Sequence, residues 1–446
     1  MRWVLLLILF LSLPAFIAYA KKSVRRREHL ILAAGILMFS SGSISVDASI
    51  IGQPDWPGPV KGLVVSFIDI IAVALIVARP KKKHNMVLVL LFIAHLMVMI
   101  LASFLAHAKM ASLYSICQYI QLILLFIALG PEFIRPSALT NMLKGFAVGL
   151  TIQAIVVLYQ KATGMVQAFG TTPHQNILGM MAQLTVFPII AALLEGAKSK
   201  LLWLGAFSGA VCVALGGSRA SLFFFAIGIA TLFLITFIRK PTARKGKLLA
   251  AGLVACAVLV PLALGTLQAR FGEAEIGTTD QSRIAFERAA SAIADDYPLG
   301  VGPNNFVPVN NLQGYAAAAG IEWGGGLLDK PVHNAYLLAR AETGWMGQAV
   351  LFLLLVTVIC LGIRGAFLNR KVPVPGFALG SAVATFTIAL HSNYEFAWFT
   401  MEIQRLFFVN AAIVAACITI SRLANREAKL LLSRKKRTAR PLEANA

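Results

Sequence analysis

The side chains in this sequence that are best suited to catalysis or binding lie in its last third. His333 can accept a proton as a neutral imidazole, and Arg340 can pair with an anion. If residues 333–347 form one helix, Arg340 lies on the same narrow face as His333, at about 100° per residue. Gly344 and Gly347 fall on that face too and would let another helix pack beside a polar site. Alternatively, the histidine is an exposed rim residue and the glycines serve only packing.

The elements that must position these residues include a polar segment at residues 267–334. The other loops on the same side are short, so a loop of this length is where a site is expected. It contains a probable amphipathic helix at residues 281–294, followed by a turn from Pro298 to Pro303. Three further arginines come from this loop, namely Arg270, Arg283 and Arg288.

The composition defines the surroundings of this loop. Of the 446 residues, 58% are apolar and 13% are charged, with a mean hydropathy of +0.78. A soluble domain carries about twice that share of charge, so a soluble enzyme and a disordered chain are excluded. We predict an all-α integral membrane protein with about 12–13 transmembrane helices. The apolar stretches are residues 3–20, 29–47, 63–78, 85–106, 111–130, 142–160, 177–196, 201–217, 220–238, 248–266, 345–363, 374–390 and 406–421.

The distribution of charge predicts the orientation of the helices. With the N-terminus outside, most of the 40 Lys and Arg residues fall in inner loops, and most of the 19 acids fall outside. The net charge of +21 is therefore a topology signal with affinity for anionic lipid, and we exclude nucleic acid as a partner. Ala20 ends a stretch that resembles a signal-peptidase site. Cleavage there would leave the basic residues 21–27 outside, so we expect the first helix to be retained.

This topology divides the chain into four parts. Residues 1–266 hold ten N-terminal spans, and residues 267–334 form the large outer loop. Residues 335–421 hold the C-terminal spans, and residues 422–446 form a basic cytoplasmic tail.

Metal and disulfide chemistry are not indicated. All five cysteines fall within predicted spans without metal-ligand or Cys-x-x-Cys spacing, so we expect small buried side chains. Glu273 with Glu275, or Asp295 with Asp296, offers an acidic pair that could hold a divalent cation. Ordinary loop charge explains both pairs better, and we expect no cofactor and no metal.

Three stretches, in order along the chain, resemble motifs of the O-antigen ligase and O-antigen polymerase superfamily. These motifs are a Ser-Arg-Ala turn, an arginine-bearing loop helix followed by Pro-x-Gly-x-Gly, and His-Asn followed nine residues later by Gly-x-x-Gly. The resemblance covers roughly residues 200–405, and thirteen spans instead of the usual twelve is a departure. In this sequence the motifs are Ser218-Arg219-Ala220, Arg283 with Pro298 to Gly302, and His333-Asn334 with Gly344 to Gly347.

The resemblance implies a metal-independent, inverting membrane glycosyltransferase that uses a polyprenyl-diphosphate-linked glycan. It implies that His333 is the catalytic base and that Arg219 and Arg283 bind the diphosphate. Alternatively, Arg219 is a snorkelling interfacial arginine, and Glu342 is a candidate to orient the histidine. The other candidate substrate-binding residues are Arg270, Arg288, Arg340, Asn334 and His174. For His174, a solvated loop residue is the favoured alternative. For Asn334, the alternative is a helix N-cap.

Two activities fit the resemblance and differ only in the acceptor. The first hypothesis is an O-antigen ligase with a lipid A–core acceptor, and the alternative is an O-antigen or exopolysaccharide polymerase. A transporter or flippase is less favoured, because the spans hold few charges and the large loop holds many. The resemblance implies a multi-pass protein of the bacterial inner membrane with one large periplasmic loop domain that carries the site. The implied partners are the undecaprenyl-diphosphate-linked donor, a glycan or lipid A–core acceptor, and membrane lipids.

Overall fold

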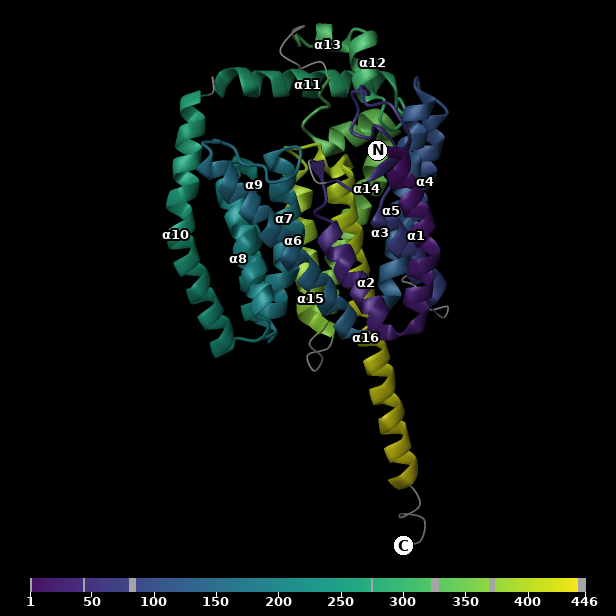
Figure 1. Ribbon diagram of the computed structural model, residues 1–446, viewed down its shortest axis with the longest axis vertical. Coiled ribbons are helices and arrows are strands. Elements are labelled where there is room, and N and C mark those ends of the chain that lie inside the picture. Colours follow the sequence, from purple (N-terminus) through teal and green to yellow (C-terminus); the bar gives the residue numbers. More distant parts are fainter. Residues whose placement is uncertain are drawn as a thin grey trace.

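The computed structural model describes residues 2–42, 45–79, 86–273, 276–321, 329–368 and 374–439. In this part of the chain the helices form an upright bundle (Figure 1). Thirteen helices coincide with the thirteen predicted apolar stretches: α1 Arg2–Lys22, α2 Val24–Leu37, α3 Phe67–Ala78, α4 Met86–Ser103, α5 Lys109–Glu132, α6 Pro136–Ala162, α7 Gln175–Leu194, α8 Lys200–Leu215, α9 Arg219–Arg239, α10 Ala243–Glu273, α14 Ala335–Leu368, α15 Val374–His391 and α16 Met401–Ala439.

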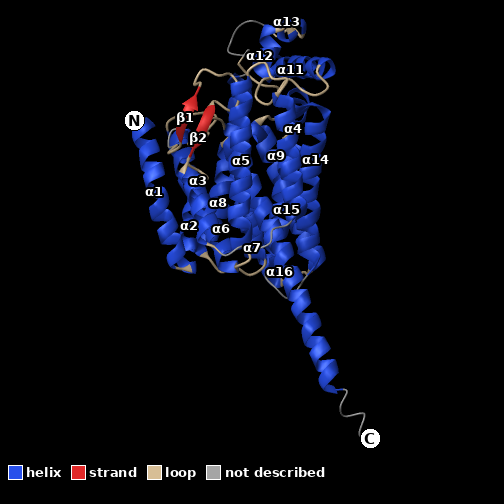
Figure 2. Ribbon diagram, turned by 90° about the vertical axis from the view of Figure 1, so that its right-hand side faces the viewer, coloured by secondary structure: helices blue, strands red, loops and turns tan. Residues whose placement is uncertain are grey.

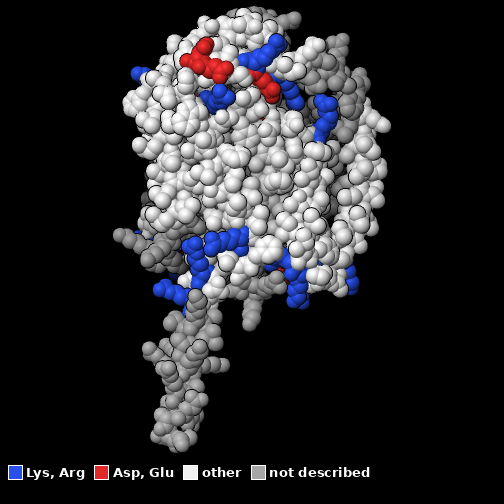
Figure 3. Space-filling model, turned by 180° about the vertical axis from the view of Figure 1, so that it is seen from behind, with Lys and Arg blue, Asp and Glu red and all other residues white. Residues whose placement is uncertain are grey.

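The bundle is that of a membrane protein. Among the described residues, nine helices are long and apolar enough to cross a bilayer, and three shorter apolar helices accompany them at residues 67–78, 200–215 and 376–391. Lys and Arg gather at the two ends of the molecule, with an uncharged belt between them (Figure 3). The prediction of an all-α, multi-pass integral membrane protein is therefore confirmed.

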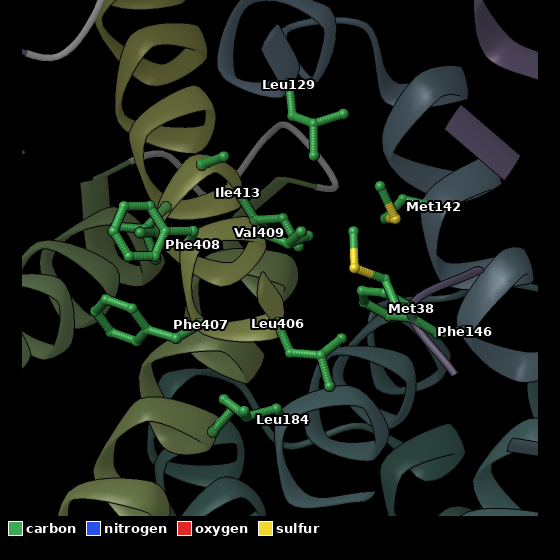
Figure 4. Close-up of a cluster of buried hydrophobic side chains, with 14 of the residues drawn as sticks. Met38, Leu129, Met142, Phe146, Leu184, Leu406, Phe407, Phe408, Val409 and Ile413 are labelled. Carbon is green, nitrogen blue, oxygen red and sulfur yellow. The ribbon is translucent and has the colours of Figure 1, made fainter. Parts of the chain in front are cut away.

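The core lies where α7 meets α15 and α16. The apolar stretch of α7 is 94% buried, so this helix is surrounded by protein and not by lipid. Leu406 and Phe407 of α16 lie near Leu184 of α7 in the buried cluster (Figure 4). On another side of the cluster, Met142 and Phe146 come from α6. This rigid centre carries the elements that hold the site.

Helix α10 is different, because only 11% of its apolar stretch is buried. It packs mainly on α8 and stands at the edge of the bundle (Figure 1). Its upper end leads to the loop helix α11, so the arginine-bearing loop is connected to a helix that is mostly exposed.

A short hairpin was not foreseen from the sequence. The second apolar stretch was predicted to continue to residue 47, but α2 ends at Leu37. The chain then forms two antiparallel strands, β1 Ala48–Gly52 and β2 Gly62–Val65, with Ala48 opposite Val65 (Figure 2). Residues between the strands include three prolines, which favour a turn over a helix. The hairpin lies beside α1 and α5.

The large loop folds into a cap across the end of the bundle that we call the loop face. It contains α11 Ile276–Asp296, α12 Phe306–Leu312 and α13 Tyr315–Ala318 (Figure 1). The predicted amphipathic helix is present within α11, where Phe286, Ala290 and Ile293 are buried in a second small core. Ile284, which the periodicity placed on the same face, is 57% exposed. The cap therefore has its own apolar core and holds Arg283 on a regular helix.

Candidate active site

His333 lies on the loop face, just before α14. Asn334 caps the helix, since its side-chain oxygen accepts hydrogen bonds from the backbone N–H groups of Tyr336 and Leu337, at 3.1 and 3.2 Å. The backbone N–H of Ala335 donates to the carbonyl of Ser392 at 2.8 Å, which fixes this turn to the end of α15. Asn334 is thus engaged as an N-cap, the alternative that the sequence had left open.

The nearest charged partner of His333 is Glu395, a residue that sequence reasoning missed. The distance between His333 Nδ1 and Glu395 Oε1 is 3.3 Å, although the ring N–H is not aligned for a hydrogen bond. Glu395 is only 2% exposed. Its carboxylate also accepts hydrogen bonds from the Asn176 side chain and from the backbone N–H of Phe396. Packing on the Phe396 ring, at 5.4 Å between centroids, holds the imidazole in place.

Electrostatics keep Glu395 ionised. Burial raises the pKa of this carboxyl, but the nearby His333, the hydrogen bond from Asn176 and the charge of His174 outweigh burial and lower the pKa to about 2. A permanent negative charge therefore lies beside the imidazole at neutral pH. The one available signal in the sequence was an acid between two aromatic residues, Tyr394 and Phe396, in the short connection between the last two helices.

A pocket of about 370 Å³ opens beside this pair and brings together the two arginines that the resemblance singled out. Arg219 is the first residue of α9, and Arg283 comes from α11. Asn176 lines the same pocket and donates a hydrogen bond to Glu395, whose carboxylate lies 3.3 Å from His333 Nδ1, so one buried acid connects the pocket to the histidine. The lining residues are Asn176, Ser218, Arg219, Ala220, Phe223, Phe224, Arg283 and Tyr394.

The pocket suits an anion. Ser218 caps α9 by accepting the backbone N–H of Ser221 at 3.2 Å, which directs the positive end of this helix dipole toward the pocket. Arg219 and Arg283 add two guanidinium groups, which pair with phosphate oxygens in a fork geometry. The aromatic rings of Phe224 and Tyr394 lie 5.8 Å apart and form an apolar wall. A ligand with a negative head and an apolar or ring-shaped part fits such a lining.

The other predicted arginines are not in this pocket. Arg340 pairs with Asp295 of α11 at 3.0 Å, and both side chains are exposed. Arg288 is exposed on α11 and is not among the lining residues. The side chain of Arg270 lies outside the described residues. The geometry therefore separates Arg219 and Arg283 from the weaker candidates.

Two further candidates have structural contacts. His174 caps α7, because its Nδ1 accepts the backbone N–H of Asn176 at 3.2 Å. This contact places it at the start of the helix that presents Asn176 to the pocket. Glu342 does not orient His333. Its buried carboxylate accepts the backbone N–H groups of Asn304 and Phe306, at 2.8 and 3.1 Å, and so it holds the loop.

The prediction of one continuous helical face from residue 333 to residue 347 is wrong. His333 precedes the helix, and Gly344 interrupts it with φ 70° and ψ −175°. The turn from Pro298 to Gly302 occupies this break. The N–H groups of Val301 and Gly302 donate to the carbonyls of Ala341 and Glu342, both at 2.9 Å. We call this contact the turn–break junction.

Glycine is required on both sides of the junction. Gly344 has a left-handed φ, and a Cβ there would collide with the carbonyl of Pro298. Gly300 also has a left-handed φ, of 85°, and a Cβ there would meet the carbonyl of Glu342. Two of the three motifs thus owe their glycines to backbone packing, which sets the loop cap, and with it Arg283, relative to α14.

The acidic pairs weighed as cation ligands are occupied or not described. Asp295 pairs with Arg340, and Asp296 accepts a hydrogen bond from the Tyr315 hydroxyl at 2.6 Å. The side chains of Glu273 and Glu275 lie outside the described residues. Within the described part of the chain, no group of three or more His, Cys, Asp or Glu residues is placed to hold a metal ion.

Comparison with known proteins gives a match to one family over part of the chain. A family model described as O-Antigen ligase matches residues 204–352. The matched range runs from α8 into α14 and contains Arg219, Arg283 and His333, whereas Asn176 and Glu395 lie outside it. No curated protein matches the chain.

Proposed function

We propose that this chain, whose residues 204–352 match the O-antigen ligase family, transfers a glycan from a polyprenyl-diphosphate carrier to an acceptor hydroxyl. The observation that carries the proposal is the pocket that holds Arg219 and Arg283 and connects through Asn176 to the His333–Glu395 pair. This arrangement supplies a place for a diphosphate and a base next to it. Both are needed when a sugar is displaced from its phosphate.

In the proposed reaction, the acceptor hydroxyl attacks the anomeric carbon of the donor sugar. A new carbon–oxygen bond forms, while the bond from that carbon to the phosphate oxygen breaks with its electron pair. Nδ1 of His333 faces Glu395, so Nε2 is the atom that takes the hydroxyl proton. Glu395 stabilises the imidazolium that results, and Arg219 with Arg283 stabilises the departing diphosphate. A single displacement of this kind inverts the anomeric centre.

The lipid tail of the donor needs a route out of the pocket into the bilayer. Phe223 of α9 lines the pocket and is 62% exposed, and α10 beyond it is mostly exposed as well. We propose that the pocket opens sideways here, so that the polyprenyl chain stays in lipid while the diphosphate reaches the arginines. In this arrangement the loop face is the periplasmic face of the bacterial inner membrane.

The proposed acceptor is lipid A–core, which makes the protein an O-antigen ligase. A polymerase of the same superfamily uses the same donor and base and extends another lipid-linked glycan instead. The proposal favours the ligase because the motif from His333 to Gly347 resembles that of ligases, although polymerases carry similar stretches.

The test is a deletion strain complemented with the wild-type gene, with His333→Ala or with His29→Ala. His29 lies on α2 and contacts Tyr19, so it serves as a histidine control away from the pocket. A ligase is supported if the deletion and His333→Ala strains lose all glycan from lipid A–core and keep long chains on the carrier lipid. A single repeat unit on core, or loss of exopolysaccharide with core glycan intact, indicates the polymerase. Normal glycan in the His333→Ala strain removes this residue from the mechanism.

A further inference from the structure

A second pocket lies at the opposite end of the bundle from His333. Its volume is about 370 Å³, the same as that of the pocket on the loop face. It is formed by the α7–α8 connection, the start of α8 and the start of α10. We call it the basal pocket, and its lining residues are Ala197, Lys198, Lys200, Trp203, Arg244, Lys247 and Leu248.

The basal pocket has a strongly positive lining. Four of its residues are Lys or Arg, and no Asp or Glu is among them. The nearest acid in the chain, Glu195, pairs with Arg239 at 2.8 Å. Arg244 is held rigidly, since it donates to the carbonyls of Leu193 and Ala197 at 3.0 and 2.6 Å. One cation is therefore fixed in the wall, while the three exposed lysines can close around an anion.

The start of α8 adds to this potential. Ser199 occupies the N-cap position but makes no side-chain hydrogen bond to the first turn. The first N–H groups of a helix need an acceptor, and its dipole favours an anion there. Lys200, the first residue of α8, lines the pocket. A negatively charged group in the pocket would therefore meet side-chain and backbone donors together.

An apolar track leaves the pocket along the same helix face. Trp203, Leu204 and Phe207 follow Lys200 at three, four and seven residues, which places them on one side of α8. Their side chains are 43%, 47% and 52% exposed. Because α10 packs only thinly on the bundle, this side of α8 is open to the bilayer. A charged pocket that continues into an exposed apolar track matches an amphiphile and not a soluble ion.

We propose that the basal pocket binds the phosphate headgroup of an anionic phospholipid, with an acyl chain along Trp203 and Phe207. Lysine and arginine side chains would recognise the phosphate oxygens of a lipid headgroup and of free phosphate alike. The apolar track favours the lipid over free phosphate. Basic pockets between transmembrane helices bind anionic headgroups in this way. The bound lipid would bridge the start of α8 and the start of α10, which both line the pocket.

The experiment uses the full-length protein in phosphatidylcholine nanodiscs that contain brominated phosphatidylglycerol, or brominated phosphatidylcholine in its place. Bromine on the acyl chain quenches tryptophan fluorescence at contact, and Trp203→Phe identifies the share that comes from Trp203. The test variant is Lys198→Gln/Lys200→Gln/Lys247→Gln. The matched control, Lys21→Gln/Lys22→Gln/Arg25→Gln, removes the same charge from the exposed α1–α2 connection at the same end of the bundle.

In the wild type and in the control variant, we expect brominated phosphatidylglycerol to quench Trp203 roughly tenfold more effectively than brominated phosphatidylcholine. In the test variant, we expect this difference between the two lipids to be lost. Equal quenching by both lipids, or an equal loss in the control variant, overturns the proposal. Inorganic phosphate is added in a separate arm. If it removes the preference at the same ionic strength as a chloride control, the site binds free phosphate and the lipid assignment is wrong.

Discussion

Replacing Glu395 with Gln tests the role of the buried carboxylate beside the base. Gln has nearly the same shape and keeps one of the two oxygens, so it can accept from the N–H of Phe396 while its amide group faces Asn176, whose side chain can turn its own oxygen to accept. The fold is therefore expected to persist. The substitution removes a negative charge 3.3 Å from His333 Nδ1. That charge matters most when the imidazole becomes positive, which happens as the acceptor proton is transferred.

The magnitude follows from the pKa of Glu395. The difference between its ordinary value of 4.5 and about 2 corresponds to about 3 kcal/mol in favour of the ionised form. His333, Asn176 and His174 share this stabilisation. An interaction with a charged partner is worth roughly 1.5–3 kcal/mol, so loss of the negative charge beside His333 is expected to slow transfer about 10- to 150-fold.

The assay is single-turnover transfer by the purified protein in nanodiscs, with a lipid-diphosphate glycan donor and its acceptor. The rate of transfer at neutral pH is expected to fall in Glu395→Gln, because less negative charge remains to stabilise the imidazolium. Glu402→Gln is the matched control, since Glu402 bonds Ser41 and does not line the pocket. A Glu395→Gln rate within about twofold of the wild type would refute the reasoning.

Three other outcomes are expected. Arg283→Gln should raise the KM for the donor about 10- to 100-fold through loss of charge-assisted hydrogen bonds, as measured by steady-state kinetics. The matched control Arg288→Gln, at an exposed residue, should leave the KM unchanged. An equal change of KM in both variants would contradict the pocket assignment. Gly344→Ala should destabilise the protein by roughly 2–4 kcal/mol, while Gly252→Ala, which meets open space, should be neutral or slightly stabilising in thermal unfolding. Because the pKa of Glu395 is lowered to about 2, its contribution to stability is present above pH 4.5 and is lost as the pH falls toward 2. The melting temperatures of the wild type and Glu395→Gln should therefore converge over that range, and a constant difference down to pH 2 would argue against an ionised carboxylate.

The sequence predicted the helices well because the bilayer demands long apolar runs, and those runs survive any tertiary arrangement. All thirteen stretches correspond to helices, and α11 contains its predicted amphipathic portion. The hairpin at residues 48–65 was missed because its short strands adjoin apolar helices and share their composition. Arg219 and Arg283 meet in one pocket, as the shared anion chemistry required.

What could not be predicted depends on contacts between distant residues. The helical period continues through Gly344, so only the inserted turn reveals the break in α14. Glu395 lies 62 residues after His333, and no local pattern connects the two. Glu342 was the nearer acid in sequence, but its carboxylate is engaged by the backbone of Asn304 and Phe306. The resemblance singled out His333 as the proposed base, whereas its acidic neighbour Glu395 is found only in three dimensions.

The turn–break junction has a consequence for exchanging parts between relatives. Residues 298–302 and 341–345 shape each other, so a chimaera that takes only one of them joins a turn to a helix that does not receive it. The exchangeable unit is therefore the whole stretch 298–345, because Phe306 also bonds Glu342 and Val309 shares a buried cluster with Ala341 of α14. Recombination between relatives should therefore give folded chimaeras with breakpoints outside 298–345 and fail with a single breakpoint between the two glycine motifs.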